Sequence, residues 1–432
     1  MTDAPAELSY RALLRIPGLS RVLVSMQIGR VAQAMVAIAL VLFTLDRYGS
    51  PALAGLVTFA SIFPGLLISP IAGALLDRHG RIRLVILDFV VALSAMLLIA
   101  VLALADALPA PLLIGIAVVS SLTSILSHTG LRSLFPIMVP RPLWERVNAI
   151  DSNGYLVAMI LGPPIAAGLV AFAGAPAALI VIGVAFGLSA VALIGVTDPP
   201  TESRSGNHLP ADAWAGVVYV WRNPTLRGLG FAISFMNVAG GMVTIVLPLI
   251  VLDRLAQGEV VVGLIFALTG ISGMASAIAF GRMDTRGREW SMLVWPMVAA
   301  VPVMALLLPA AMASVIAVGV VLLCVHSLAM GVLYGPSDIA LFTVRQRRTD
   351  PGWMGRAFAV SMAVNYMGVP IGAGLAGILA AQSLELAIVV LGIGAALAAT
   401  ASAAFLVPRQ APEAGQPLGG PELMDSVRNP GA

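Results

Sequence analysis

The stretch Gly73-Ala-Leu-Leu-Asp77-Arg78-His79-Gly80-Arg81-Ile82-Arg83 is a charged turn that joins two long apolar segments, 53–77 and 83–105. A helix of about 20 residues crosses the roughly 30 Å hydrocarbon core of a membrane, so either segment can span it. The charged side chains of the turn are too costly to bury in hydrocarbon. The stretch therefore indicates two consecutive membrane-spanning helices that meet at a charged surface turn.

The rest of the chain continues this pattern. Apolar residues make up 59% of the 432 residues and charged residues only 10%, against about 25% in an average soluble protein. Such a chain cannot cover itself with polar surface, so lipid must be its solvent. We predict an all-α membrane protein with twelve transmembrane helices, at 20–45, 53–77, 83–105, 111–136, 153–173, 176–197, 225–252, 258–281, 290–309, 312–340, 356–381 and 384–407.

Residue types that are rare or missing exclude several kinds of chemistry. Cys324 is the only cysteine, which excludes disulfides within the chain and cysteine-based metal sites. Lysine is missing altogether, so a Walker A loop and a pyridoxal Schiff base are excluded. The four histidines are far apart in the sequence. We therefore expect no catalytic residues, no metal site and no cofactor, and we do not expect an enzyme.

The arginines set the orientation. All but three of the 24 lie on one side if the N-terminus is cytoplasmic, and the exceptions are Arg30 within the membrane and Arg47 and Arg254 outside. The two outer arginines follow Asp46 and Asp253, with which we expect them to form surface pairs. Cytoplasmic loops of membrane proteins carry such an excess. We expect a multi-pass protein of the inner or plasma membrane with both termini in the cytoplasm. The same asymmetry explains the net charge of +3, so no nucleic-acid partner is expected.

A polar break divides the chain. Within it Trp214, Val217, Val218 and Trp221 recur at the spacing of an amphipathic helix, which would lie on the membrane surface. The alternative is that these residues are only the start of the next span. We predict an N-terminal half at 1–196, a cytoplasmic linker with this helix at 197–224, a C-terminal half at 225–407 and a disordered tail at 408–432.

The two halves repeat each other at an offset of about 207 residues. The matched motifs are Leu45-Asp46-Arg47 with Leu252-Asp253-Arg254, Asp77–Arg81 with Asp284–Arg288, and Gly162–Gly168 with Gly368–Gly374. Six helices therefore form a unit that is used twice. Two similar halves around a central site are typical of secondary transporters.

The turn quoted above resembles the signature G-x-L-x-D-R-x-G-R-[KR] of the major facilitator superfamily, between its second and third helices. Two further stretches, 131–136 and 145–149, resemble the proton-coupled drug-efflux branch, which includes enterobactin-type siderophore exporters and Tap-like multidrug pumps. The resemblance covers about residues 20–407. It implies two pseudo-symmetric six-helix bundles and transport of a small molecule, driven by protons.

The resemblance assigns a conformational latch to the turn and to its second copy. The alternative is that these arginines only enforce the orientation. The second copy is weaker, since Thr285 replaces Arg78 and Trp290 replaces Arg83. The latch residues are Gly73, Asp77, Arg78, Gly80, Arg81, Arg83, Asp284, Gly287 and Arg288.

The fifth helix carries a segment that resembles the antiporter signature G-P-x-x-G-G, with Ala166 and Ala167 in place of its last two glycines. Small residues allow close helix packing, and plain packing is the alternative explanation. The segment and its repeat comprise Gly162, Pro163, Pro164, Gly168, Gly368, Pro370 and Gly374.

Polar residues inside the membrane are candidate functional groups by default. Arg30 could bind an anionic group of the substrate or hold a carboxylate partner. Asp338 is the preferred proton carrier, with His128 as a second candidate. Asp88 is a further candidate, unless it only pairs with Arg81 and Arg83. The predicted substrate and proton pathway comprises Gln27, Arg30, Gln33, His128, Asn237, His326, Tyr334, Asp338, Asn365 and Tyr366.

The sequence thus favours a proton-coupled exporter of small amphiphilic molecules such as drugs, antibiotics or siderophores, working by alternating access. Its expected partners are the substrate, protons and the lipid bilayer, and we expect a monomer. Uptake of a metabolite by the same fold is the first alternative, because direction of transport is not visible in the sequence. A membrane enzyme or a sensor that transports nothing is the alternative of another class.

Overall fold

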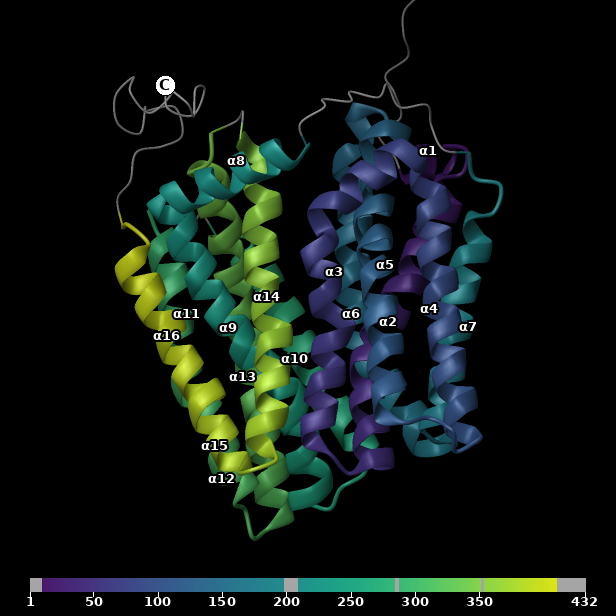
Figure 1. Cartoon of the computed structure of the whole chain (residues 1–432). Coiled ribbons are helices and arrows are strands. Elements are labelled where there is room, and N and C mark those ends of the chain that lie inside the picture. Colours follow the sequence, from purple (N-terminus) through teal and green to yellow (C-terminus); the bar gives the residue numbers. More distant parts are fainter. Residues whose placement is uncertain (1–9, 198–208, 284–286, 351–352, 410–432) are drawn as a thin grey trace, which may run out of the picture.

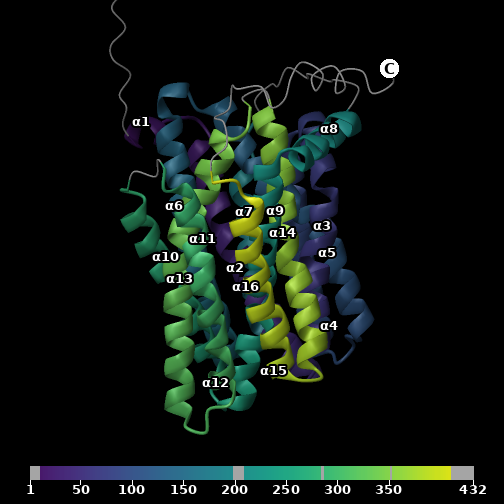
Figure 2. The ribbon, with the colours of Figure 1, turned by 90° about the vertical axis from the view of Figure 1, so that its left-hand side faces the viewer.

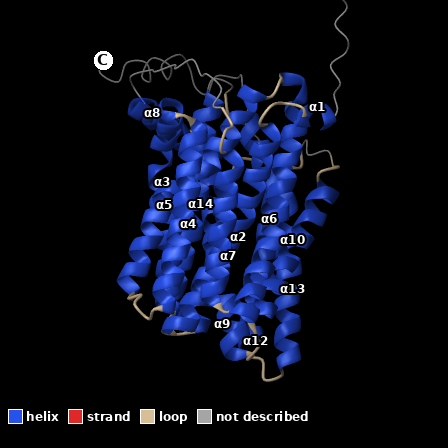
Figure 3. Cartoon of the chain, turned by 90° about the vertical axis from the view of Figure 1, so that its right-hand side faces the viewer, coloured by secondary structure: helices blue, strands red, loops and turns tan. Residues whose placement is uncertain are grey.

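The computed structural model describes residues 10–197, 209–283, 287–350 and 353–409, and the elements in these ranges are helical (Figure 3). Twelve of the described helices are long and apolar enough to cross a membrane, which confirms the predicted fold class. The first six are α2 (Leu19–Tyr48), α3 (Pro51–His79), α4 (Arg81–Leu104), α5 (Ala110–Met138), α6 (Trp144–Ala173) and α7 (Ala175–Leu193).

The second half repeats this order. Its spans are α9 (Pro224–Leu249), α10 (Glu259–Phe280), α11 (Glu289–Ala305) with α12 (Leu307–Ala311), α13 (Ile316–Arg347), α14 (Met354–Ala380), and a last span made of α15 (Leu384–Ala387) and α16 (Ala395–Ala401) joined by π-helical turns. The six span starts recur at offsets of 205 to 210, as for Ala110 and Ile316 or Arg81 and Glu289. In the view of Figure 2, α16 stands between α11 and α14.

The short helix α8 (Leu209–Arg222) falls where the sequence predicts an amphipathic helix. It is separate from α9, because the extended residue Asn223 follows it and caps α9 by accepting a hydrogen bond from the amide of Leu226. In Figure 1, α8 lies across one end of the second half, and the short α1 (Tyr10–Leu14) lies at the same end of the first half. This end is called the α8 end below, and the opposite end, where α12 lies, the α12 end.

The fifth span begins at Trp144, nine residues before the predicted start at 153. The added turns carry polar and charged residues that a hydropathy pattern assigns to a loop. One of them, Asp151, is nevertheless buried, because arginines from two other helices pair with it. The prediction of this boundary was wrong for that reason.

The two halves pack against each other through glycines near the α12 end. A Cβ atom added to Gly55 of α3 would lie 2.9 Å from the Cα atom of Gly377 of α14. A Cβ atom added to Gly263 of α10 would lie 2.7 Å from the Cα atom of Pro164 of α6. The pairs α3–α14 and α6–α10 are equivalent in the repeat, so the contact between the halves is itself symmetric. Apolar residues extend it, since Val41 belongs to the core of the second half.

The charged turns that start α4 and α11 both need glycine. Gly80 and Gly287 lie 207 residues apart and have φ angles of 91° and 73°, in the left-handed region that other residues enter only at a cost. The positive φ accounts for the glycine in both copies of the signature without any reference to function.

We predict that Gly287→Ala lowers the free energy of unfolding by about 1 kcal/mol, because alanine is strained at this φ. An added Cβ atom would meet open space at Gly287, so crowding plays no part. The apparent melting temperature in detergent measures the effect. Gly115→Ala is the control, since Gly115 lies inside α5 with the same open space and an ordinary helical φ. An equal loss in both variants would contradict the explanation.

Candidate substrate cleft between the two halves

A shared carboxylate joins three helices of the first half. Arg30 of α2 donates from Nη1 to the backbone carbonyl of Asp151 at 2.7 Å, and its Nη2 pairs with Oδ1 of the same residue. Arg132 of α5 reaches the other oxygen, Oδ2, from Nε at 2.9 Å and from Nη2 at 2.8 Å. Both oxygens of Asp151 are thus occupied, and the three side chains together carry one excess positive charge.

The two arginines differ in their access. The Arg30 side chain is 12% exposed, and its guanidinium lies 5.9 Å from the centre of the Tyr155 ring. The Arg132 side chain is 55% exposed, although it pairs with a carboxylate that is only 9% exposed. Of the two roles open to Arg30, the structure shows the carboxylate partner, and Arg132 is the arginine with an accessible face.

Gln27 and Gln33 of α2 are both half-buried. The Gln27 amide donates to the carbonyl of Gly154 on α6 at 3.1 Å. Gly154 allows this contact, because a Cβ atom there would collide with the Gln27 side chain. Gln27 therefore helps to hold α2 against α6 beside the ion pairs. It also borders a cavity of about 440 Å³ that is lined by Leu23, Met26, Gln27, Ile150, Asn153, Gly154 and Val157.

Several exposed side chains of the two halves interact with one another. Tyr155 of α6 and Tyr366 of α14 form a side-chain hydrogen bond across the halves, yet they are 38% and 43% exposed. Tyr366 also interacts electrostatically with Arg132 of the first half and Asp338 of the second, both of which are exposed. We infer that Arg132, Tyr155, Asp338 and Tyr366 border one accessible space between the halves, and we call it the central cleft.

Two more predicted pathway residues lie at this cleft. His128 is exposed and interacts electrostatically with Arg30 and Arg132, and Tyr334 interacts with Asp338. His128 and Tyr334 are 206 residues apart, as are Arg132 and Asp338. The repeat thus places an arginine on one wall and an aspartate at the equivalent position of the other.

Asn237 and Asn365 lie between α9 and α14 in the second half. Asn237, the repeat equivalent of Arg30, donates from its amide to the backbone carbonyl of Asn365 at 2.8 Å. The Asn365 side chain is buried, and in the orientation that satisfies its amide it accepts from Nη2 of Arg345 at 2.7 Å. It therefore lies behind the cleft wall.

Arg345 is a site that sequence reasoning missed. It was counted among the surface arginines, but it is 0% exposed, with its guanidinium against the rings of Phe342 and Phe358 and with Nη1 2.9 Å from the sulfur of Met362. Among the described residues no carboxylate pairs with it. The available signal was its spacing of seven residues from Asp338, which places both on one face of α13.

His326 and Asp88 are buried away from the cleft residues. His326 of α13 lies with Nδ1 2.9 Å from the carbonyl of Val303 on α11. Asp88 of α4 is 3% exposed and hydrogen-bonds with the side chains of Thr123 and Ser127 on α5. These neutral hydroxyls are partners that the sequence analysis did not consider for Asp88.

Part of the predicted latch lies outside the described residues. This holds for Asp284 and for the side-chain surroundings of Gly73 and Asp77. Arg81 is buried at the start of α4, whereas the side chains of Arg78, Arg83 and Arg288 are exposed.

The glycine and proline segments of α6 and α14 lie at helix contacts. A Cβ atom at Gly162 would lie 2.5 Å from that of Ala34 on α2, and one at Gly368 would lie 2.9 Å from that of Asn237 on α9. Pro163 and Pro164 meet Gly263 of the other half, and Gly374 meets Phe59. An added Cβ atom at Gly168 would meet open space, and Pro370 is buried.

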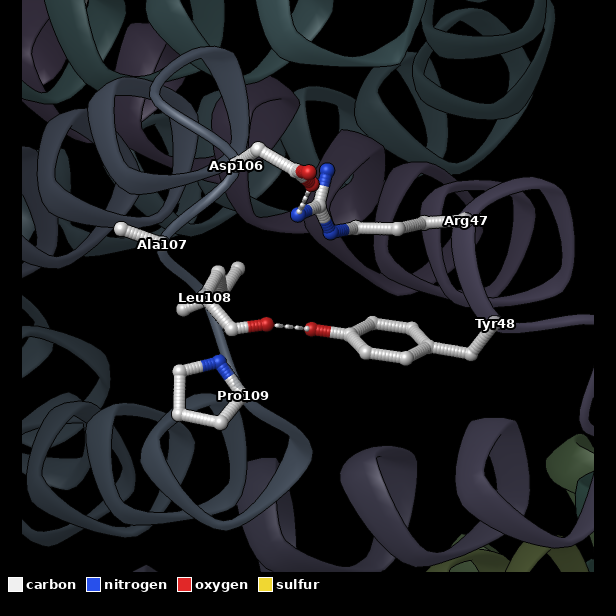
Figure 4. A pocket seen from close by; sticks show the side chains of 6 residues that line it. All are labelled: Arg47, Tyr48, Asp106, Ala107, Leu108 and Pro109. Carbon is white, nitrogen blue, oxygen red and sulfur yellow. Dashed lines mark hydrogen bonds and ion pairs between the residues drawn. The ribbon is translucent and has the colours of Figure 1, made fainter.

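The α12 end carries a separate pocket of about 470 Å³ beside the α4–α5 loop (Figure 4). Arg47 pairs there with Asp106 at 2.7 Å, and the Tyr48 hydroxyl donates to the carbonyl of Leu108 at 2.7 Å. The sequence suggested the adjacent Asp46 as the partner of Arg47, and this was wrong. Neighbouring side chains on a helix diverge by about 100°, so the partner comes from another loop.

The two repeated bundles, with charged side chains of both halves exposed in a cleft between them, define a membrane transporter of the secondary type. The family model of the Major Facilitator Superfamily matches residues 23–373. The chain belongs to the Major Facilitator Superfamily, as its signature turn suggested.

Similar proteins support this membership. An uncharacterized MFS-type transporter, y4rN of Sinorhizobium fredii, is 36% identical over 92% of this chain and 96% of its own length. The multidrug efflux pump Tap of Mycobacterium tuberculosis is 24% identical over 77% of this chain and 80% of its own. The inward-facing crystal structure of a bacterial homologue of the iron transporter ferroportin superposes with a TM-score of 0.69 at 19% identity, covering 91% and 99% of the two chains.

We predict that Asp151→Asn lowers the free energy of unfolding by about 3 kcal/mol, because it leaves two arginines without their counter-charge in a largely buried site. Thermal unfolding in detergent, followed by tryptophan fluorescence, measures the loss. Asp106→Asn removes the carboxylate from the exposed pair with Arg47 and should change stability by less than about 1 kcal/mol. Similar losses in both variants would show that the Asp151 pairs are not a structural element of the bundle.

We also predict that Gly55→Val favours a state in which the α12 end is open, because overpacking at a tight helix contact costs about 1–3 kcal/mol. Reaction of a water-soluble maleimide with Val41→Cys, in a Cys324→Ala background, reports the opening, since Val41 is buried in the present state. Gly258→Val is the control, because Gly258 has open space around it. Labelling that stays unchanged by Gly55→Val would refute the role assigned to this contact.

Proposed function

We propose that this chain is a proton-coupled secondary transporter that exports small amphiphilic molecules across the cytoplasmic membrane. The observation that carries the proposal is the central cleft, in which Arg132 and Asp338 are exposed on opposite halves of a duplicated bundle. Accessible charges that lie between two movable units are suited to bind cargo and protons.

The proposed moving units are the N-terminal half at 1–196 and the C-terminal half at 225–407, joined by the linker at 197–224 and followed by the tail at 408–432. The arginine asymmetry supports placing the α8 end and both termini in the cytoplasm. In that orientation the glycine contacts at the α12 end seal the outer side, so this conformation opens to the cytoplasm. Rocking the halves would then expose the cleft to the outside.

Asp338 is the proposed proton carrier, with His128 as the second candidate, since both are exposed at the cleft. A proton on Asp338 and a cationic group of the cargo would compete for the same carboxylate. Each would favour its own conformation, which is the requirement for exchange of one against the other. Asn237, Asn365 and His326 would support the pathway from behind its walls.

The latch and the glycine segments complete the proposed cycle. Asp77, Arg81 and their repeat at Asp284 and Arg288 would hold the α8 end when it closes. The segments at 162–168 and 368–374 would keep the helix contacts tight enough to prevent leakage. A monomer suffices for this mechanism, since each chain contains both halves.

Export is favoured over uptake by the similarity to the multidrug efflux pump Tap over 77% of the chain. Uptake of a metabolite is the second candidate, because the same alternating cycle runs in either direction. No further domain is needed for either function, and neither requires a catalytic group.

The test uses inside-out membrane vesicles with an imposed pH gradient. We expect accumulation of the amphiphilic dye Hoechst 33342 that depends on the gradient and is abolished when nigericin collapses it. Asp338→Asn should remove this dependence, because an amide cannot carry the proton. Asp46→Asn is the control, since it removes an exposed carboxylate near the α12 end.

Three results would count against the proposal. They are accumulation that ignores the gradient, accumulation only in right-side-out vesicles, and a fully coupled Asp338→Asn variant. The first removes proton coupling, the second reverses the direction, and the third removes Asp338 from the mechanism.

A further inference from the structure

We propose that the cargo of the central cleft is zwitterionic, with an oxyanion group that binds Arg132 and an ammonium group that binds Asp338. The inference rests on the proposed function and adds to it the charge pattern of the cargo and the residue that recognises each charge. It also separates the two arginines of the first half, since Arg30 would only position the site.

The Arg132 guanidinium has one edge that forms no hydrogen bond to the described residues. A guanidinium carries five N–H donors in a rigid plane. Nε and Nη2 of Arg132 both donate to a single oxygen of Asp151, at 2.9 and 2.8 Å. The remaining N–H groups, on Nη1 and on the outer side of Nη2, have no partner among the described residues. That edge fits a carboxylate, sulfonate or phosphate through two parallel hydrogen bonds.

The wall of the cleft formed by the first half has a net positive charge. Arg30 pairs with Oδ1 of Asp151 and Arg132 with Oδ2, so one carboxylate charge is shared by two guanidinium groups. One positive charge is left over, and it belongs to the exposed side chain. Because electrostatic interactions strengthen as water is excluded, closure of the cleft favours an anion at this point.

The wall of the cleft formed by the second half carries the opposite charge. Asp338 is exposed, and no cation is paired with it among the described residues. Arg345, on the same face of α13, is buried against the rings of Phe342 and Phe358. Asp338 is therefore an accessible carboxylate, and an ammonium group of the cargo can compete there with the proton.

The internal repeat relates the positions of the two opposite charges. Arg132 and Asp338 lie 206 residues apart, on the equivalent helices α5 and α13. A pseudo-twofold axis places equivalent residues at the same depth on facing walls. Both interact electrostatically with the same side chain, Tyr366. A ligand with separated opposite charges can bridge the two halves, whereas a singly charged ligand satisfies only one wall.

The aromatic side chains between the charges indicate the rest of the cargo. Tyr155 and Tyr366 present partly exposed rings and are joined by a hydrogen bond across the cleft. Tyrosine rings contact apolar and aromatic groups while their hydroxyls stay hydrated. The cargo we infer therefore carries an apolar or aromatic body beside its two charged groups.

The test compares four fluorescent probes that share one dansyl group and differ only in charge. Nα-dansyl-lysine is zwitterionic, its carboxamide is a cation, dansyl-norleucine is an anion, and dansyl-norleucinamide is neutral. Their dissociation constants are measured on the full-length protein in lipid nanodiscs. For the wild type we expect the zwitterion to bind at least about tenfold more tightly than either singly charged probe, which corresponds to about 1.4 kcal/mol for each charge.

The variants assign each charge to a residue. Arg132→Gln should abolish the preference for the carboxylate and keep that for the ammonium group, and Asp338→Asn should do the reverse. Arg254→Gln is the matched control, because Arg254 is 48% exposed and pairs with one carboxylate, Glu385, at 3.2 Å. It should leave all four affinities unchanged.

Several outcomes would overturn the inference. These are equal affinity of the wild type for the zwitterion and the cation, binding of none of the probes, and a carboxylate preference that survives Arg132→Gln. The wild-type comparison is decisive even if a variant fails to fold. Binding in nanodiscs needs no pH gradient, so loss of proton-driven export in vesicles would refute the proposed function and leave this result standing.

Discussion

The pairing of Asp151 with Arg30 and Arg132 is the interaction on which the first half depends. Hydrocarbon does not hydrate a charge, so a charged side chain inside the membrane needs partners within the protein or contact with a water-filled space. One carboxylate here holds side chains from α2 and α5 on α6, and it uses both oxygens to do so. Because two arginines share one carboxylate, one positive charge is left over. The exposed Arg132 presents this charge at the cleft.

The repeat supplies a symmetric frame, and the chemistry within it is asymmetric. Equivalent helices form the two contacts between halves, with small residues at Gly55 and Gly263 that let the backbones approach. At equivalent positions the side chains differ, since Arg132 corresponds to Asp338 and Arg30 to Asn237. A symmetric frame allows two alternative arrangements of the halves, while asymmetric side chains let cargo and protons distinguish them.

The sequence predicted the helices far better than the contacts of their polar residues. The spans could be predicted because a long apolar run in lipid forms a membrane-spanning helix. The start of α6 was missed because a paired Asp151 reads as a loop residue. Arg345 was assigned to the surface because orientation rules count arginines without regard to which face of a helix they occupy. Arg47 was assigned to its neighbour Asp46, although helix geometry directs adjacent side chains apart.

The amino-acid sequence by itself determined that the chain spans a membrane, how many spans it has, that its halves are duplicated and which family it resembles. Hydropathy, spacing and short glycine-containing turns are local properties of the chain. Only the tertiary structure decided which charges meet. Arg30, Arg132 and Asp151 come from three helices, and Tyr155 and Tyr366 from two halves, so their distances depend on packing between segments that are far apart in the sequence. Local patterns hold no record of such distances.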